Sequence, residues 1–132
     1  MQLTDITTKE DIERLVNTFY GRVRADELLG PIFNSVIGDH WETHLPKMYA
    51  FWGMSLFGEG GYRGNAVQKH VEIDKHFTLE QLHFDRWISL WREMIDSLYA
   101  GPVAEDAKKK ANLMLQLIQI KVAAGRTGKS LY

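Results

Sequence analysis

Apolar residues recur along the chain at the spacing of α-helices. In residues 7–26 the apolar positions are Ile12, Leu15, Val16, Phe19, Tyr20 and Val23. Such a pattern is the stripe that one face of a helix presents to a protein core. Thr7 and Glu10 have the spacing of a capping box, so we expect this helix to begin beside them.

A second helix is expected from about Thr43 to Phe57. Pro46 fits this helix only in the first turn, where its missing N–H costs nothing. Gly30-Pro31, earlier in the chain, indicates a break. Residues 32–39 are therefore expected to form a loop or a single turn.

The C-terminal part of the chain predicts two more helices. The first begins near Thr78 and Gln81 and ends at Gly101-Pro102, and its apolar side carries Phe84, Trp87, Ile88, Trp91, Ile95 and Leu98. The last helix stops near Gly125, and its apolar side carries Ala107, Ala111, Met114, Leu115, Ile118 and Val122. No stretch alternates as a strand does, so residues 1–132 are expected to form one all-α domain.

A short helix carrying His70 is expected after a stretch rich in glycine. Residues 58–65 have the sequence GEGGYRGN, which is poorly compatible with regular structure. Asn65 can cap the helix that follows. A helix of barely two turns is marginal in isolation. We therefore expect something outside the chain to hold this segment in place.

Composition excludes several classes of protein. Lys and Arg total 16 and Asp and Glu total 17, a balance that argues against a nucleic-acid binder. Without cysteine there is no disulfide framework and no thiolate metal site, which fits the cytosol. The N-terminal sequence MQLTDITTKE has no signal-peptide pattern, and no apolar run is long enough to cross a bilayer. A cytoplasmic protein without membrane insertion is expected.

Aromatic residues are concentrated in two stretches. They make up 11% of the chain and include four tryptophans, and they cluster in HWETHLPKMYAFW and HFDRWISLW. This much flat apolar surface would suit a pocket for a large, flat ligand.

Histidines are the main candidates for metal chemistry. The five are His40, His44, His70, His76 and His83. His40 and His44 have the spacing of a zinc-protease motif, but Trp41 stands where that motif needs glutamate. No nucleophile elbow and no phosphate-binding glycine loop is present. Taken singly, Tyr20, His44, His70 and Trp87 have ordinary structural explanations as core or surface residues.

Four motifs, taken in their order and spacing, resemble those of the truncated haemoglobins, most closely their third group. They are FYGRVRAD-LLGPIF, H-PK-YAFW, GEGGYRGNAVQKH and HFDRWISLW, and the resemblance extends from about Phe19 to Val122. It implies a reduced globin fold in which two helices pack over two. It also implies a haem b cofactor, whose iron and apolar disc would hold the short helix of His70.

The resemblance assigns roles to particular side chains. His70 would be the proximal ligand of the haem iron, and Phe33 would pack against the haem. Tyr20 and Trp87 would donate hydrogen bonds to a bound ligand. His44 would lie on the same distal side, where it could donate to the ligand, gate the pocket or bind the iron itself.

Other residues would complete the haem pocket in the same resemblance. Met48 would lie against the haem face, one turn after His44. Lys47 would reach a haem propionate. Phe51 and Trp52 would close the pocket wall.

Three functions remain open from the sequence. The favoured one is a haem globin that binds O2, and also CO or NO, for oxygen binding, transport or sensing, with a reductase as partner. The alternative is an enzyme of NO or peroxide detoxification, acting as an NO dioxygenase or a peroxidase-like haem protein. The third is an all-α module that binds an apolar ligand without iron, which leaves the position of His70 unexplained.

Overall fold

The computed structural model describes residues 2–60, 69–70, 72–74 and 77–127. Within these ranges the chain forms helices and no strand, which confirms the all-α prediction. The main helices are α1 (Lys9–Ala25), α2 (Gly30–Ile37), α3 (Trp41–Phe57), α5 (Gln81–Leu98) and α6 (Pro102–Thr127). Residues 69–70 and 72–74 are also helical. Among the described helices, none combines the length and apolar character needed to span a membrane.

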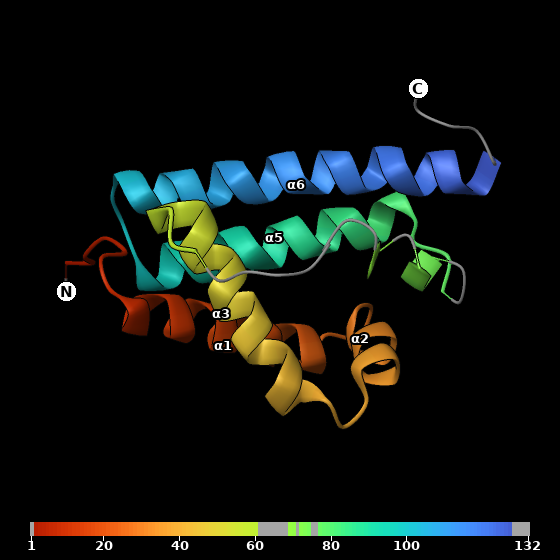
Figure 1. The fold of residues 1–132 in the computed structure, drawn as a ribbon, viewed down its shortest axis with the longest axis horizontal. Coiled ribbons are helices and arrows are strands. Elements are labelled where there is room, and N and C mark those ends of the chain that lie inside the picture. Colours follow the sequence, from red (N-terminus) through yellow and green to blue (C-terminus); the bar gives the residue numbers. More distant parts are fainter. Residues whose placement is uncertain (1, 61–68, 71, 75–76, 128–132) are drawn as a thin grey trace.

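The four long helices form two pairs (Figure 1). α5 and α6 run side by side, and α1 packs against α5. α3 crosses α1 obliquely and reaches α6 near its own C-terminal end, where Lys110 Nζ donates a hydrogen bond to the carbonyl oxygen of Ser55. The short helix α2 packs against α1. This arrangement matches the expected packing of two helices over two.

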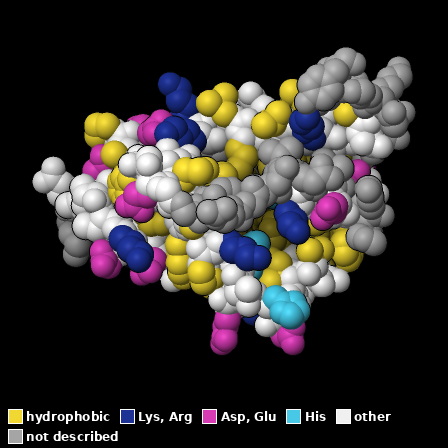
Figure 2. Space-filling model, viewed as in Figure 1, with side chains coloured by type: hydrophobic (Ala, Val, Ile, Leu, Met, Phe, Trp, Pro, Cys, Tyr) yellow, Lys and Arg dark blue, Asp and Glu magenta, His cyan; other side chains and the backbone are white. Residues whose placement is uncertain are grey.

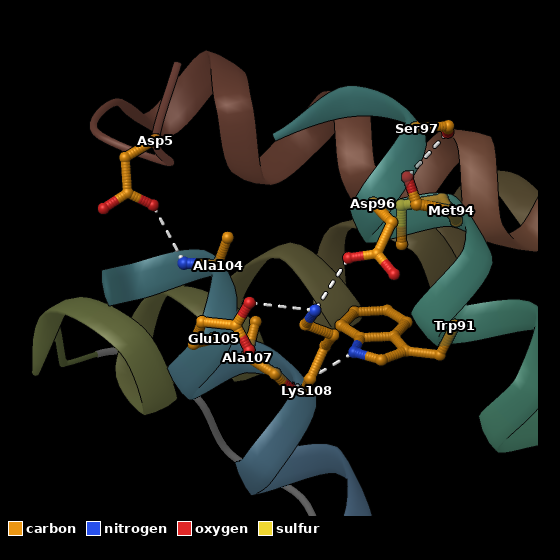
Figure 3. A network of polar contacts seen from close by, with 9 residues as sticks. All are labelled: Asp5, Trp91, Met94, Asp96, Ser97, Ala104, Glu105, Ala107 and Lys108. Atoms are coloured by element: carbon orange, nitrogen blue, oxygen red, sulfur yellow. Dashed lines mark hydrogen bonds and ion pairs between the residues drawn. The ribbon is translucent and has the colours of Figure 1, made fainter. Parts of the chain in front are cut away.

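The predicted apolar stripes of α1 and α5 meet in the core. Trp91 of α5 is only 1% exposed and stacks on Trp52 of α3, with ring centroids 4.4 Å apart. Its indole N–H donates to the carbonyl oxygen of Ala107 on α6 at 3.1 Å (Figure 3). Large aromatic side chains dominate core energetics because each one buries so much surface. Trp91 therefore joins three helices at the centre of the fold.

A carboxylate outside the helix caps the beginning of α6. Asp5 accepts hydrogen bonds from the backbone N–H groups of Val103 and Ala104 at 3.0 and 2.8 Å, which are donors that a helix N-terminus leaves without a partner. Figure 3 shows the bond from Ala104. Burial alone would raise the pKa of Asp5, but these N–H groups and that of Ile6 lower it. The N-terminal segment is thus tied to the α5–α6 pair.

Residues 30–37 form a helix where the sequence predicted a break, so the expected loop at residues 32–39 is wrong. Pro31 lies in the first turn of α2, where no N–H is needed. Asp26 accepts from the N–H groups of Leu28 and Leu29 just before the helix begins. Gly38 ends it with a φ of +60°, a conformation that favours glycine. The Gly-Pro pair therefore begins a helix here.

The start of α3 also differs from the prediction. The helix begins at Trp41, two residues before Thr43, so Pro46 lies beyond the first turn. Proline there removes the hydrogen bond that an N–H would make to the carbonyl of Glu42. Both residues are exposed, so water can satisfy that carbonyl and the helix continues to Phe57.

The capping box of α1 is shifted by one residue from the prediction. Thr8 is the N-cap, and its hydroxyl accepts from the N–H of Asp11 at 3.1 Å. The carboxylate of Asp11 accepts in return from the N–H of Thr8 at 3.0 Å. The predicted pair of Thr7 and Glu10 is therefore wrong in register, although the motif itself is present.

The start of α5 is displaced in the same way. Glu80 is its N-cap, not Thr78, and the backbone N–H of Glu80 donates to Nδ1 of His83 at 2.9 Å. The end of α5 near the Gly101-Pro102 turn is confirmed, since the helix stops at Leu98. α6 continues to Thr127, slightly beyond the predicted end.

Candidate functional site

An aromatic cluster forms where α1, α2 and α3 meet. Tyr20 of α1 lies 5.5 Å from Trp41 and 5.6 Å from His44, measured between ring centroids. Phe33 of α2 lies 6.3 Å from the Tyr20 ring. The structure thus brings together Tyr20, Phe33 and His44, all singled out in the sequence.

Trp87 adjoins this cluster through Phe19. The Phe19 ring lies 5.3 Å from the Tyr20 ring and 5.1 Å from the Trp87 ring. Trp87 is 9% exposed and lies parallel to Trp91, with planes only 3° apart. Trp87 is therefore positioned by the core stack on one side and approaches the Tyr20 cluster on the other.

His44 and His70 influence each other electrostatically. His44 is half-buried on α3, and burial lowers the pKa of its imidazole, with the positive charges of Lys47 and His70 lowering it further. The imidazole of His44 is consequently neutral at neutral pH and has one N–H donor and one acceptor nitrogen. His70 is half-buried, and residues 69–70 are helical. The two histidines that the sequence assigned to opposite sides of a cofactor thus lie within electrostatic range of one another.

The remaining histidines are placed differently. His83 accepts a backbone hydrogen bond at the start of α5, and His40 is exposed beside Asp39. His76 lies outside the described residues, as do Asn65 and most of the glycine-rich stretch before His70. No three His, Asp or Glu side chains gather as metal ligands in the part of the chain that the structure describes. Ligation of a haem iron by a single imidazole needs no such group.

The other predicted pocket residues follow His44 along α3. Met48 and Phe51 are half-buried against the core, and Lys47 is exposed. Trp52 is 3% exposed and is held in the stack with Trp91. On the face shown in Figure 2, hydrophobic and histidine side chains gather over α2 and α3, with lysine and arginine side chains beside them.

Trp41 belongs to the cluster, although the sequence did not single it out. It is the first residue of α3 and is 6% exposed. Its ring lies 5.9 Å from the His44 ring, and the guanidinium carbon of Arg24 lies 4.6 Å over its centre. Its position three residues before His44 places both on one helix face, a signal that could have been used.

Comparison with known proteins decides the family. No protein-family model matches the sequence. The chain is 37% identical over 114 residues to the group 3 truncated hemoglobin ctb of Campylobacter jejuni. The matched region covers 84% of this chain and 87% of the relative. The chain belongs to the group III truncated haemoglobins. The crystal structure of a group III truncated hemoglobin from Campylobacter jejuni matches this fold with a TM-score of 0.68 and 30% identity, over 99% of this chain and 98% of that one.

Family membership confirms the resemblance that the four sequence motifs carry, and the truncated globin fold with it. The roles of Tyr20, His44, His70 and Trp87 are argued instead from where the structure places these side chains and from what they contact.

Proposed function

We propose that this truncated haemoglobin binds haem b through His70 and holds a diatomic gas, O2 above all, beside Tyr20, His44 and Trp87. The observation that carries the proposal is the cluster of the Tyr20, Trp41 and His44 rings, which joins α1 to α3. His44 is half-buried beside the rings of Tyr20 and Trp41, and burial lowers the pKa of its imidazole, with the charges of Lys47 and His70 lowering it further. A haem held by His70 would have these aromatic and polar side chains for its ligand pocket.

The residues present fit this cofactor. His70 offers the imidazole that globins use as proximal ligand. Phe33, Met48 and Phe51 offer half-buried apolar surface, and the exposed ammonium of Lys47 would pair with a propionate. The chain has no cysteine, so it cannot form the thioether bonds of a c-type haem, and haem b is the form we propose.

The polar side chains near the gas would decide how long it stays. When bound, haem would supply an iron that can take a diatomic ligand. Tyr20 and Trp87 each carry one polar hydrogen and stay neutral near pH 7. Hydrogen bonds are stronger where water is excluded, so these donors would retain a ligand that carries partial negative charge. His44 lies near the N-terminal end of α3, close in sequence to the exposed His40. We assign the control of ligand entry to His44.

The proposed partners follow from this chemistry. They are O2, CO or NO as ligand and a reductase that keeps the iron ferrous. The nearly balanced charge of the chain favours neither nucleic acid nor an acidic surface as partner. The cysteine-free composition favours the cytoplasm as its location.

Haem content of a His70→Leu variant tests the proposal. The wild type should show a strong Soret band that moves on reduction and on addition of CO. His70→Leu should be largely haem-free and melt at a lower temperature, because a bound cofactor stabilises only the folded state. His40→Ala is the matched control, since His40 is exposed, and it should keep its haem. Normal haem content with an unchanged ferrous spectrum in His70→Leu, or a wild type without a Soret band, would overturn the proposal.

A further inference from the structure

We infer that Trp41 is a further hydrogen-bond donor to the bound gas, acting through its indole Nε1–H; this rests on the proposed function. The indole nitrogen of Trp41 is buried and has no hydrogen-bond acceptor among the described residues. Buried polar groups in native proteins are nearly always paired, so an unpaired one needs an explanation. In the core of the same protein, by contrast, the indole N–H of Trp91 donates a hydrogen bond to the carbonyl oxygen of Ala107 (Figure 3).

The surroundings of Trp41 indicate what the acceptor is. The rings of Tyr20, Trp41 and His44 form a triangle with sides of 5.5, 5.6 and 5.9 Å between centroids. Each of the three rings carries a polar hydrogen. A small acceptor with partial negative charge, placed beside this triangle, would have three donors within reach. Bound O2 has that character, and bound CO has much less of it.

If the role of Trp41 were purely structural, a different effect of substitutions on ligand binding would be expected. The guanidinium of Arg24 lies over the Trp41 ring at 4.6 Å, which is a cation–π contact with an exposed side chain. If Trp41 served only as the partner of this contact, removing Arg24 would affect ligand binding as removing the indole does. Arg24 itself is exposed and makes no ring contact with Tyr20 or His44 among the described contacts.

The experiment compares Trp41→Phe with Arg24→Ala in the full-length, haem-loaded protein. Trp41→Phe keeps an aromatic ring and removes the N–H. We expect O2 to dissociate about two- to tenfold faster, the effect of losing one ordinary hydrogen bond, and CO to dissociate at nearly the wild-type rate. The infrared stretch of bound CO should move to higher frequency, because one fewer positive dipole faces its oxygen. Arg24→Ala should leave both rates and the stretch near those of the wild type.

Other outcomes overturn the inference. Equal changes for O2 and CO in Trp41→Phe, no change for either gas, or the same changes in Arg24→Ala would each show that the indole N–H is not a donor. Each of these results would leave haem binding intact, so the proposed function would stand. A wild type without haem would instead overturn the proposed function and the inference together.

A second measurement covers the case in which Trp41→Phe takes up too little haem. The indole N–H of Trp41 can be identified in the wild-type protein by its proximity to the Tyr20 and His44 rings. Slower exchange of this hydrogen with solvent in the O2 complex than in the CO complex would support the inference. Equal exchange in the two complexes would overturn it.

Discussion

The rings of Tyr20 and His44 meet edge to face, with centroids 5.6 Å apart and planes at 83°. The phenol comes from α1 and the imidazole from α3, so the contact joins two helices that only tertiary packing brings together. Both side chains are half-buried, and the lowered pKa of His44 keeps it neutral beside the phenol. Two neutral side chains thus lie at one site, and replacing each in turn separates their roles.

Tyr20→Phe should release O2 much faster and CO only slightly faster. The change removes the hydroxyl and little volume, so its effect is that of a lost hydrogen bond to a polarised ligand, about 1–3 kcal/mol. This corresponds to roughly a tenfold to hundredfold increase in the O2 dissociation rate. Stopped-flow measurement of both gases checks it. An equal change for O2 and CO would mean that packing, not hydrogen bonding, is what Tyr20 contributes.

Tyr20 and Trp87 should compensate for one another. Both rings contact Phe19, so the two donors belong to one aromatic group and either could turn toward the ligand when the other is gone. Each single variant would keep one donor, so the double variant should speed O2 dissociation by more, counted in free energy, than the two single variants added together. Trp87→Phe also leaves space beside Trp91, so CO dissociation serves as the control for packing. Strict additivity would show that each donor acts alone.

His44→Ala should speed ligand entry more than ligand loss. His44 lies one turn from the start of α3, at the edge of the cluster and with Trp41 and Tyr20 against its ring. Removing the imidazole opens that edge, so association of CO and O2 should accelerate while dissociation changes less. Flash photolysis measures the association rate directly. A dominant increase in dissociation would make His44 a main donor instead of a gate.

Periodicity alone predicted the long helices because the positions that it selects are those that the core buries. Ile12, Leu15 and Phe19 on α1, and Phe84 and Trp91 on α5, are all nearly inaccessible. Helix ends were less predictable, since neighbouring polar residues compete to cap them. Asp11 accepts from the N–H groups of both Thr7 and Thr8, and only the tertiary structure selects which residue becomes the N-cap.

The sequence predicted the site residues that belong to a family motif. It did not predict a residue whose role depends on its three-dimensional surroundings. Tyr20, Phe33 and His44 were found by resemblance, and the structure places their rings together. Trp41 was missed because the helix was expected to begin at Thr43, which left Trp41 outside the helix face that carries His44. Its distinguishing feature, a buried N–H without an acceptor among the described residues, exists only in three dimensions.

Asp26 links the site to the rest of the fold. Its carboxylate is 4% exposed and accepts from Nη2 and Nε of Arg86 on α5 at 2.6 and 2.7 Å. It also accepts from the N–H groups of Leu28 and Leu29, just before the helix that carries Phe33. Burial alone would raise the pKa of Asp26, but the hydrogen bonds and charge of Arg86, with the two backbone N–H groups, lower it.

Asp26→Asn should therefore destabilise the protein near neutral pH and matter less in acid. A carboxylate whose pKa is lowered by folding contributes its stability above its ordinary value of 3.8, and that contribution is lost as the pH falls through the folded pKa. We expect the free energy of unfolding to fall by about 1 kcal/mol at pH 7, because the amide loses the negative charge that strengthens the hydrogen bonds from Arg86. The difference between wild type and variant should shrink as the pH drops below 3.8. Urea unfolding across this range measures it, and a difference that stays constant with pH would show that the charge of Asp26 is not what stabilises the turn.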